Sequence, residues 1–327
     1  AVRIMTGAPI PAGADTVVPF EETDEEVRRR RSKRLREIAI NRPFKAGANI
    51  RCAGEDIASG SIVLEKGHVL RPADIGIIAS LGLAEVSVIR RPVVAILATG
   101  NEVTPVGHPL PPGGIYNSNS FSLAAQVKKA GGIPRMLGIA RDSIKSLVAA
   151  IRRGLDSDLL ITTGGVSVGD YDLVKDILAG EGQISFWTVR MKPGKPLAFG
   201  TLGSASGRRT PHLGLPGNPV SAMISFELFG RPAIRKMLGL KNLTRPTVKA
   251  ILKSTINNRD GRRVFARVTV VKSDNTYFAT LAGEQGSGIL TSMSRANGLA
   301  IVPEDIAVAL PGQSVDVLML DWEEAQE

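Results

Sequence analysis

The chain contains 327 residues, and its 41 lysines and arginines outnumber its 31 aspartates and glutamates to give a net charge of +10. At roughly 150 residues per domain, this length predicts two or three domains. A single cysteine excludes a disulfide framework and a four-thiolate zinc site, and three isolated histidines lack the spacing of a His-ligated metal centre. No apolar run reaches the ~18–20 residues of a membrane span, and no signal peptide is evident, so we expect a reducing, cytoplasmic location without a membrane partner.

Residues 1–54 are expected to form a partial, elongated and β-rich domain. The chain opens at Ala1, without a methionine, inside a predicted strand at residues 2–5, so we expect a preceding segment to be missing. An acidic run at residues 21–26 precedes a basic run at residues 28–36, with no aromatic residue between them. This pattern predicts a solvated hairpin whose opposite charges neutralise each other, rather than a nucleic-acid surface.

Residues 55–90 are expected to form a connector within the same elongated region. We predict strands at residues 61–65 and 85–89, with a helix between them. That helix is expected to begin at Pro72, because proline is favoured in the first turn.

Residues 91–243 alternate apolar runs with amphipathic segments, which predicts a three-layer α/β domain with a mostly parallel sheet. The predicted strands and helices occupy residues 93–98, 121–130, 143–151, 159–162 and 172–179. The remaining residues, 244–327, carry short strand patterns separated by turn residues and predict a small all-β sandwich or barrel. These strands are predicted at residues 248–252, 264–271, 277–281, 299–302 and 315–320.

Two loops with carboxylates are expected at the carboxyl ends of the parallel strands, where doubly wound sheets bind their ligands. The first runs from Thr99 to Glu102, and the second runs from Thr163 to Gly169 and leads to Asp172. Adjacent glycines allow a ligand to approach the backbone closely. Each loop is also compatible with an ordinary turn, and Asp142 and Asp172 are compatible with simple helix capping.

Two further loops carry groups suited to an oxyanion. Lys192 and Lys195 lie in a Lys-Pro-Gly-Lys-Pro sequence, and residues 214–222 place Ser221 near a helix start. Lysines on a stiff loop suit phosphate-like anions, although a solvated basic loop is an equally good interpretation. Because carboxylates alone repel phosphate, the combination predicts a phosphate ester or pyrophosphate handled together with Mg²⁺.

These motifs resemble those of the molybdopterin molybdenumtransferase family, which includes the C-terminal domain of gephyrin. The matching segments, spread in order along the chain, are residues 6–11, 54–57, 99–102, 117–119, 163–169 with Asp172, 192–196 and 214–221. The β segment with Arg267 and residues 285–288 is similar to the final domain of the family.

The resemblance implies an enzyme that transfers molybdate to adenylylated molybdopterin with Mg²⁺ and releases AMP. It implies catalytic roles for Glu102, Asp172, Lys192 and Lys195, with Glu102 and Asp172 also binding Mg²⁺. Molybdate would be held by Lys192, Lys195, Ser221, Arg267 and Ser287. The residues implied in binding the molybdopterin nucleotide are Thr99, Gly100, Asn117, Asn119, Asp142, Gly164, Gly165, Ser167, Gly169, Pro216, Asn218 and Pro219.

The resemblance further implies a homodimer in which Thr6 and Asp56 face the partner subunit's site. A molybdopterin adenylyltransferase and molybdoenzyme apoproteins are candidate partners. Three alternatives remain open: an α/β protein similar to the adenylyltransferases or to the competence-damage-inducible family, a catalytically inactive dimeric scaffold, and nucleic-acid binding driven by the net charge. For the last, a continuous basic stripe would be required.

Overall fold

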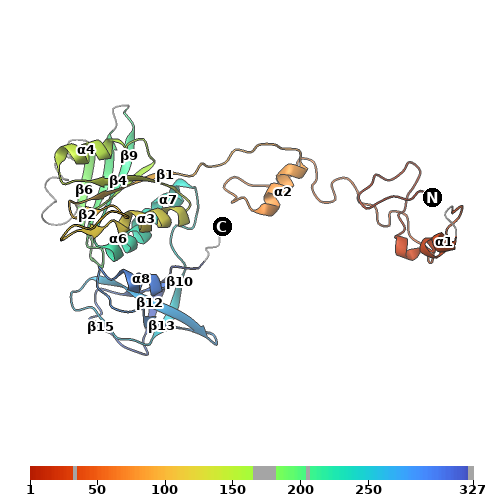
Figure 1. Ribbon diagram of the computed structural model, residues 1–327. Coiled ribbons are helices and arrows are strands. Elements are labelled where there is room, and N and C mark those ends of the chain that lie inside the picture. The colour runs from red at the N-terminus through yellow and green to blue at the C-terminus, as the bar shows by residue number, and fades with distance from the viewer. Residues whose placement is uncertain (32–34, 165–181, 204–206, 323–327) are drawn as a thin grey trace. The chain divides into compact units, whose positions relative to one another are not determined.

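The computed structural model describes residues 1–31, 35–164, 182–203 and 207–322 (Figure 1). The chain divides into two compact units, residues 1–66 and 67–327. Within the described ranges, no helix combines the length and the apolar character needed to cross a membrane.

The smaller unit contains a 3-10 helix, η1 (Phe20–Glu22), and one α-helix, α1 (Glu25–Arg31). The predicted strand at residues 2–5 is wrong, because this segment pairs with no other strand among the described residues. The predicted hairpin forms only in part: Thr23 makes an isolated antiparallel bridge with Ile40, and Glu25–Arg31 between them forms α1. Residues four apart are neighbours on a helix, so Arg29 pairs with Glu25 at 2.6 Å and Arg30 with Glu26 at 2.7 Å. The expected neutralisation of the two charge runs is thereby confirmed.

The connector contains helix α2 (Pro72–Ser80), which begins at the predicted proline. Its first turn is held by the Asp74 carboxylate, which accepts the Arg71 backbone N–H at 2.7 Å and lies 2.9 Å from His68 Nε2. The strands predicted at residues 61–65 and 85–89 are wrong, since neither segment pairs with a described strand. A suitable residue pattern forms a strand only where a second backbone lies alongside to complete the hydrogen bonds.

The α/β domain is built on a six-stranded sheet with the order β4-β1-β5-β9-β8-β6. The bounds of these strands are β1 (Val93–Thr99), β4 (Ile133–Ala140), β5 (Leu159–Thr163), β6 (Gly182–Thr188), β8 (Pro196–Gly203) and β9 (Arg209–Leu215). The first four strands in the order are parallel, whereas β8 and β6 pair in the antiparallel sense. A separate two-stranded pair, β2 (Val103–Thr104) with β3 (Ile115–Tyr116), follows β1.

Helices cover both faces of this sheet, as predicted (Figure 1). Their bounds are α3 (Ser118–Lys129), α4 (Ile144–Arg152), α6 (Pro219–Ser225), the π-helical turn η2 (Phe226–Gly230) and α7 (Arg231–Met237). The helix predicted at residues 172–179 lies outside the described residues. Successive side chains of β1 point to opposite faces of the sheet, so each face has its own apolar core beneath its own helices. Val94 and Ile96 pack with α3, α6 and α7, whereas Ala95 and Leu97 pack with α4 on the opposite face.

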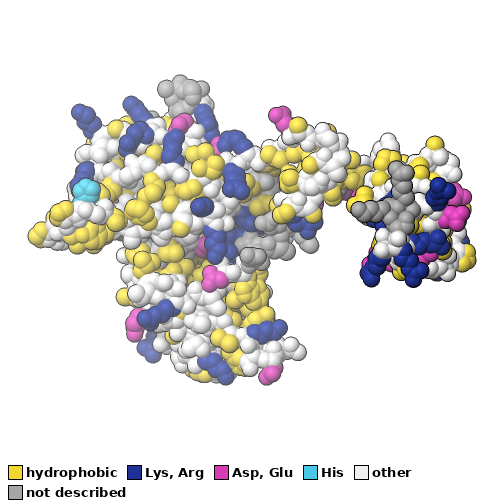
Figure 2. Space-filling model, turned by 45° about the vertical axis from the view of Figure 1, so that its right-hand side comes forward, with side chains coloured by type: hydrophobic (Ala, Val, Ile, Leu, Met, Phe, Trp, Pro, Cys, Tyr) yellow, Lys and Arg dark blue, Asp and Glu magenta, His cyan; other side chains and the backbone are white. Residues whose placement is uncertain are grey.

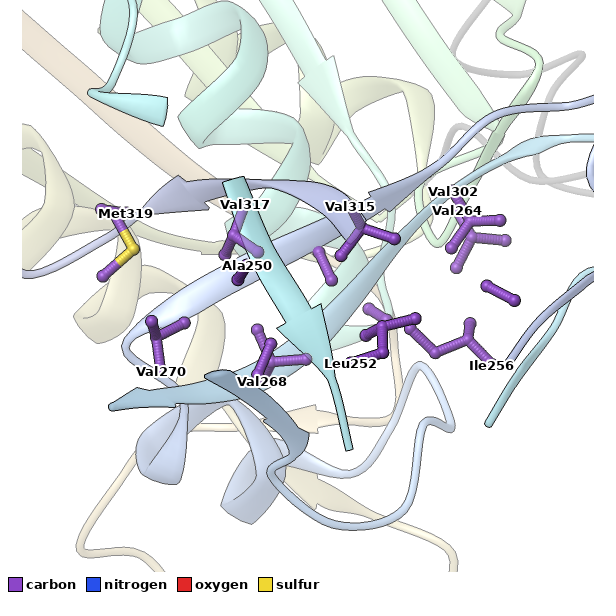
Figure 3. Close-up of a cluster of buried hydrophobic side chains, with 14 residues drawn as sticks. Ala250, Leu252, Ile256, Val264, Val268, Val270, Val302, Val315, Val317 and Met319 are labelled. Atoms are coloured by element: carbon purple, nitrogen blue, oxygen red, sulfur yellow. The ribbon is translucent and has the colours of Figure 1, made fainter. Parts of the chain in front are cut away.

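The C-terminal domain is a closed barrel. Its strands are β7 (Met191–Lys192), β10 (Thr247–Leu252), β12 (Arg263–Ser273), β13 (Thr276–Leu281), β14 (Gly298–Val302) and β16 (Ser314–Met319). They follow the order β13-β10-β16-β14-β12-β7, and an additional β12–β13 pairing closes the ring. Small and β-branched side chains such as Ala250, Val268 and Val317 fill the interior (Figure 3). A small pair, β11 (Ile256–Asn257) with β15 (Val308–Ala309), and helix α8 (Leu290–Arg295) complete the domain.

An apolar seam joins the barrel to the α/β domain through helix α6. Val220 and Ile224 of α6 contact Phe265 and Leu299 of the barrel, together with Met191 of the strand β7 that joins the barrel sheet. Figure 1 shows α6 between the sheet and the barrel. The two domains of the larger unit therefore share a continuous core.

His212 on β9 is buried in the sheet, and we expect it to make folding sensitive to acid. Its Nε2 lies 3.0 Å from Thr162 Oγ1, and burial lowers its pKa from 6.5 to about 4. The unfolded chain therefore binds more protons between these values, so stability is complete above the unfolded pKa and falls as the pH decreases. Between about pH 7.5 and about pH 5, His212 should account for a loss of about 2 kcal/mol.

The measurement is urea unfolding at both pH values. The variant His212→Leu should lose about 2 kcal/mol less than the wild type over this range. The exposed His108 supplies the control, because His108→Gln should leave the dependence on pH unchanged. If the free energy of unfolding fell equally with pH in the wild type and in His212→Leu, the acid sensitivity would not come from His212.

Candidate functional site

The candidate site lies where the four parallel strands end. Because β4, β1, β5 and β9 run in the same direction, their carboxyl ends lie at one edge of the sheet. The loops that follow them contain most of the predicted nucleotide-binding residues. The prediction that ligand-binding loops gather at this edge agrees with the observed strand order.

Close contacts join the loops that follow β1, β5 and β9. The Thr99 hydroxyl, at the end of β1, donates a hydrogen bond to the Thr163 carbonyl at 3.2 Å. Gly164 has a φ of +86°, and a Cβ there would lie 2.7 Å from the Thr99 carbonyl oxygen. A Cβ on Gly217 would lie 3.6 Å from Gly164 Cα. Glycine is thus required at Gly164 both by its backbone conformation and by the neighbouring strand end.

The two predicted asparagines at the start of α3 make hydrogen bonds within the protein. Asn117 caps the helix by accepting the Ser120 N–H at 3.1 Å. Asn119 Nδ2 donates to Thr163 Oγ1 at 3.3 Å and to the Gly217 carbonyl at 2.7 Å. Asn119 Oδ1 is buried and has no hydrogen-bond partner within the described part of the chain.

The loop after β9 leads directly into α6. Pro216 is buried at its start, Asn218 stands at the N-cap position, and Pro219 is the first residue of the helix. The Asn218 carbonyl accepts the Ala222 N–H at 2.9 Å. These residues place the beginning of α6 beside Gly164 and Asn119.

The acidic side of the site is formed by the loops after β1 and β4. Asp142 Oδ2 accepts the Asn101 backbone N–H at 2.9 Å, and Asn101 Oδ1 accepts the Asp142 backbone N–H at 3.1 Å. The exposed Glu102 folds back over Gly100, where a Cβ would lie 2.5 Å from Glu102 Oε2. No described residue forms an ion pair or hydrogen bond with the Glu102 carboxylate. Asn101 was not among the predicted residues, since an asparagine in a turn gives no signal of its distant partner.

Four further predicted residues lie outside the described residues. They are Gly165, Ser167, Gly169 and Asp172. Their assigned roles remain predictions. Within the described ranges, no group of three or more histidine, cysteine, aspartate or glutamate side chains is placed to hold a metal ion.

The lysine loop is anchored on α6 by its central residues. Pro193 and Gly194 are buried, while Lys192 and Lys195 on either side are exposed. Gly194 has a φ of +106°, and a Cβ there would lie 2.6 Å from Ser225 Oγ. The centre of this loop is therefore packed in the protein while both lysines face solvent, so the choice between an anion site and a solvated basic loop stays open.

Lys192 pairs with a carboxylate of the C-terminal domain, a contact that the sequence did not predict. Lys192 Nζ lies 3.2 Å from Asp260 Oδ2, and Arg262 also pairs with this carboxylate. The Arg262 hydrogen bond, followed by the Lys192 hydrogen bond, lowers the pKa of Asp260. In contrast, Lys195 has no such partner among the described residues. The Lys192–Asp260 pair has no signal in the amino-acid pattern, because the two residues are far apart along the chain.

Two of the residues implied in binding molybdate, Arg267 and Ser287, make hydrogen bonds within the protein. Arg267 is only 1% exposed, and its guanidinium donates to the carbonyls of residues 284–286 and to Ser292 Oγ. Four hydrogen bonds of Arg267 thus go to this loop and to Ser292, and its direct contact with molybdate stays a prediction. The Ser287 carbonyl accepts the Val220 N–H at 3.1 Å, which brings residue 287 beside the start of α6. Ser221 is buried there, at 4% exposure.

Thr6 and Asp56 belong to the smaller unit and are exposed. Their predicted place at a partner's site remains a prediction. Figure 2 shows Lys and Arg side chains scattered over the visible face of the larger unit, among hydrophobic and neutral atoms. On that face, the arrangement does not form the continuous basic stripe that nucleic-acid binding would require.

Known families match the chain in three consecutive regions. Residues 1–82 match the MoeA N-terminal region (domain I and II), residues 95–236 match a probable molybdopterin binding domain, and residues 249–320 match the MoeA C-terminal region (domain IV). The fold and its site thus define a protein with a molybdopterin-binding type of α/β domain followed by a β-rich domain.

Individual relatives agree with these regions. The molybdopterin molybdenumtransferase 2 of Mycobacterium tuberculosis is 39% identical over 96% of this chain and 76% of its own length. The molybdopterin molybdenumtransferase of Haemophilus influenzae is 36% identical over 97% of the chain and 76% of its own length. A solved structure of a molybdopterin biosynthesis protein from Pyrococcus horikosii has a TM-score of 0.76 and 30% identity, covering 96% of this chain and 74% of that one. The chain therefore belongs to the molybdopterin molybdenumtransferase family of enzymes, which act in molybdenum cofactor biosynthesis.

The packing of the lysine loop on α6 can be tested at Gly194. The variant Gly194→Ala combines an unfavourable left-handed backbone with a Cβ placed 2.6 Å from Ser225 Oγ and 2.8 Å from Met191 Cε. We expect it to lower the free energy of unfolding by about 1–2 kcal/mol for the backbone, with a smaller further cost because the ends of the Ser225 and Met191 side chains must move. Chemical denaturation measures the loss.

Gly138 supplies the matched control. Its φ is +85°, but nothing lies within 4 Å of the position that a Cβ would take, so Gly138→Ala carries the backbone cost alone. That variant should lose only about 1–2 kcal/mol. A smaller loss in Gly194→Ala than in Gly138→Ala would contradict the packing of the lysine loop on α6.

Proposed function

We propose that this enzyme transfers molybdate to adenylylated molybdopterin with Mg²⁺ and releases AMP. The observation that carries the proposal is the seam at α6, where an exposed lysine loop, a buried serine and the strand-end loops all meet one short segment. That segment links the carboxylate loops, through Gly217, to the barrel, through Val220. A phosphate-bearing substrate and a tetrahedral oxyanion require such cationic and carboxylate groups side by side.

The carboxylate side of the site fits Mg²⁺ by its donor chemistry. Glu102 is exposed without a described partner, and Asp142 uses one of its oxygens to accept the Asn101 N–H. Mg²⁺ prefers oxygen ligands and is commonly held by one or two carboxylates together with substrate phosphates. Glu102, Asp142 and Asp172 would hold the ion. Bound there, Mg²⁺ would neutralise charge on the phosphates as the bond to AMP breaks.

The cationic side is suited to molybdate. Lys195 is free of described partners, and Lys192 offers a second ammonium group beside the barrel. Ser221 lies at the helix start near Ser287. These groups would hold the oxyanion beside the dithiolene of the substrate, so the protein acts mainly by positioning and by stabilising charge.

The proposal includes a homodimer in which Thr6 and Asp56 of one subunit face the site of the other. Both residues are exposed, as such a role requires. It also includes a cytoplasmic location and functional partners at either end of the reaction, namely a molybdopterin adenylyltransferase and molybdoenzyme apoproteins. The matches of residues 1–82 and 249–320 to MoeA regions, in addition to the molybdopterin binding domain, favour this function over an adenylyltransferase-like protein.

The lysine assignment predicts a defect specific to molybdate. Lys195→Ala removes a charge-assisted contact, so kcat/KM for molybdate should fall about 10- to 100-fold in an AMP-release assay. AMP release by the wild type should require molybdate and Mg²⁺ together. The control is Lys241→Ala, which removes an exposed lysine after α7 and should leave the rate unchanged. A wild-type rate for Lys195→Ala would contradict the assignment.

The carboxylate assignment predicts a defect specific to Mg²⁺. Glu102→Gln keeps the shape of the side chain but removes its charge, so the Mg²⁺ concentration for half-maximal AMP release should rise about tenfold or more. The measurement is a Mg²⁺ titration at saturating molybdate. Glu85→Gln is the control, since Glu85 is an exposed residue of the connector. An unchanged Mg²⁺ requirement in Glu102→Gln would contradict the role of this carboxylate.

A further inference from the structure

The turn between β11 and β12, residues 258–262, is anchored at both of its ends. At the start, Asn258 is 1% exposed, and its backbone N–H donates to the Ala307 carbonyl at 2.7 Å. At the end, Arg263 donates its backbone N–H to the Arg190 carbonyl at 2.9 Å, where β12 begins to pair with β7. The turn is therefore fixed beside β7, the short strand that leads into the lysine loop.

Asp260 lies in this turn, and its carboxylate is shared by two cations. Lys192 Nζ is 3.2 Å from Asp260 Oδ2, and the Arg262 guanidinium donates to the same oxygen. These contacts, that of Arg262 first, lower the pKa of Asp260, so its carboxylate stays ionised at neutral pH. The two cations and one carboxylate together keep a net positive charge, and the cluster therefore still attracts an anion.

The backbone of the lysine loop does not by itself fix the Lys192 side chain. The loop packs through its buried centre, Pro193 and Gly194, whereas the Lys192 side chain is 47% exposed. An exposed lysine adopts many rotamers, and ordering them costs free energy when a ligand binds. Contact with Asp260 limits that freedom before an anion arrives. Lys195, in contrast, makes no such contact among the described residues.

We propose that Asp260 is a positioning residue for Lys192: paired with Arg262, it holds the Lys192 ammonium group in place at the lysine loop for an incoming oxyanion. The link to molybdate rests on the function proposed above, whereas the holding of Lys192 does not. Competition between the Asp260 carboxylate and the oxyanion for the lysine would have the opposite effect. Positioning predicts weaker molybdate binding when Asp260 loses its charge, and competition predicts tighter binding.

Trace acetylation of the lysines tests the holding of Lys192 without any assay of activity. An amine paired with a carboxylate reacts slowly with acetic anhydride, so the acetylation rate of Lys192 in Asp260→Asn should rise about two- to fivefold, the range of an exposed ion pair. Mass spectrometry of the digested protein measures Lys192 and Lys195 separately, and the rate at Lys195 should stay unchanged. An unchanged rate at Lys192 in Asp260→Asn would overturn the proposal.

Two further variants control the acetylation experiment. Glu304→Gln removes the carboxylate that pairs with Arg263 at 3.1 Å at the start of β12, and it should leave the rate at Lys192 unchanged. Asp260→Glu keeps a carboxylate in the turn and should leave Lys192 near its wild-type rate. This variant separates the loss of the charge from damage to the turn.

The kinetics of AMP release then test the link to molybdate. Asp260→Asn should raise the KM for molybdate about two- to fivefold and leave the KM for adenylylated molybdopterin unchanged. In a Lys192→Ala background the same substitution should have no further effect, because a positioning residue acts only through its partner. A lower KM for molybdate in Asp260→Asn, or a further rise in the Lys192→Ala background, would overturn the link.

The two experiments separate failure of this proposal from failure of the proposed function. If Asp260→Asn speeds acetylation of Lys192 but leaves the KM for molybdate unchanged, the holding of Lys192 stands and its use for molybdate is overturned. If the wild type releases no AMP in response to molybdate, the proposed function fails, and acetylation still decides whether Asp260 holds Lys192.

Discussion

The packing of helix α6 between the sheet and the barrel is the constraint on which the rest of the larger unit depends. One face of this short helix contributes Ala222 to the core of the α/β domain, and another contributes Val220 and Ile224 to the seam with the barrel. Burial of apolar side chains on both sides fixes the helix in position. The lysine loop, the glycine-rich strand ends and the Ser287 loop each contact it, so its position determines where all three lie.

In the proposed site, the carboxylates and the lysines come from different parts of the fold. The carboxylates of Glu102 and Asp142 follow parallel strands of the sheet, whereas the two lysines lie where the chain passes into the barrel sheet. Glycines at positions 164 and 194 permit the close approaches on the two sides, because a side chain at either position would collide with a neighbour.

The amino-acid pattern predicted some elements of the structure correctly and others wrongly. The apolar run at residues 93–98 forms the expected buried parallel strand, and the element expected at residues 143–151 forms helix α4, where Ser143 accepts the Ser146 N–H. The strands expected at 61–65 and 85–89 fail because strand formation depends on a second backbone that the local pattern does not reveal. The charged segment near residue 25 forms a helix, since its acids and arginines are spaced four apart. Arg267 was singled out by its motif, but its surroundings of three carbonyls depend on a loop that is distant in sequence.

The sequence by itself indicated the α/β domain, the β-rich domain after it, the family, and the loops that carry carboxylates, glycines and lysines, because these follow from local pattern and motif. The β-rich region expected at residues 1–54 has no strand among its described residues. Only the tertiary structure decided which of these groups are free and which already have partners. Lys192 is paired with Asp260 and Arg267 is enclosed by carbonyls, while Lys195 and Glu102 remain without partners among the described residues. The physical reason is that a hydrogen bond or ion pair depends on distances of a few ångströms in space, which separation along the chain does not specify.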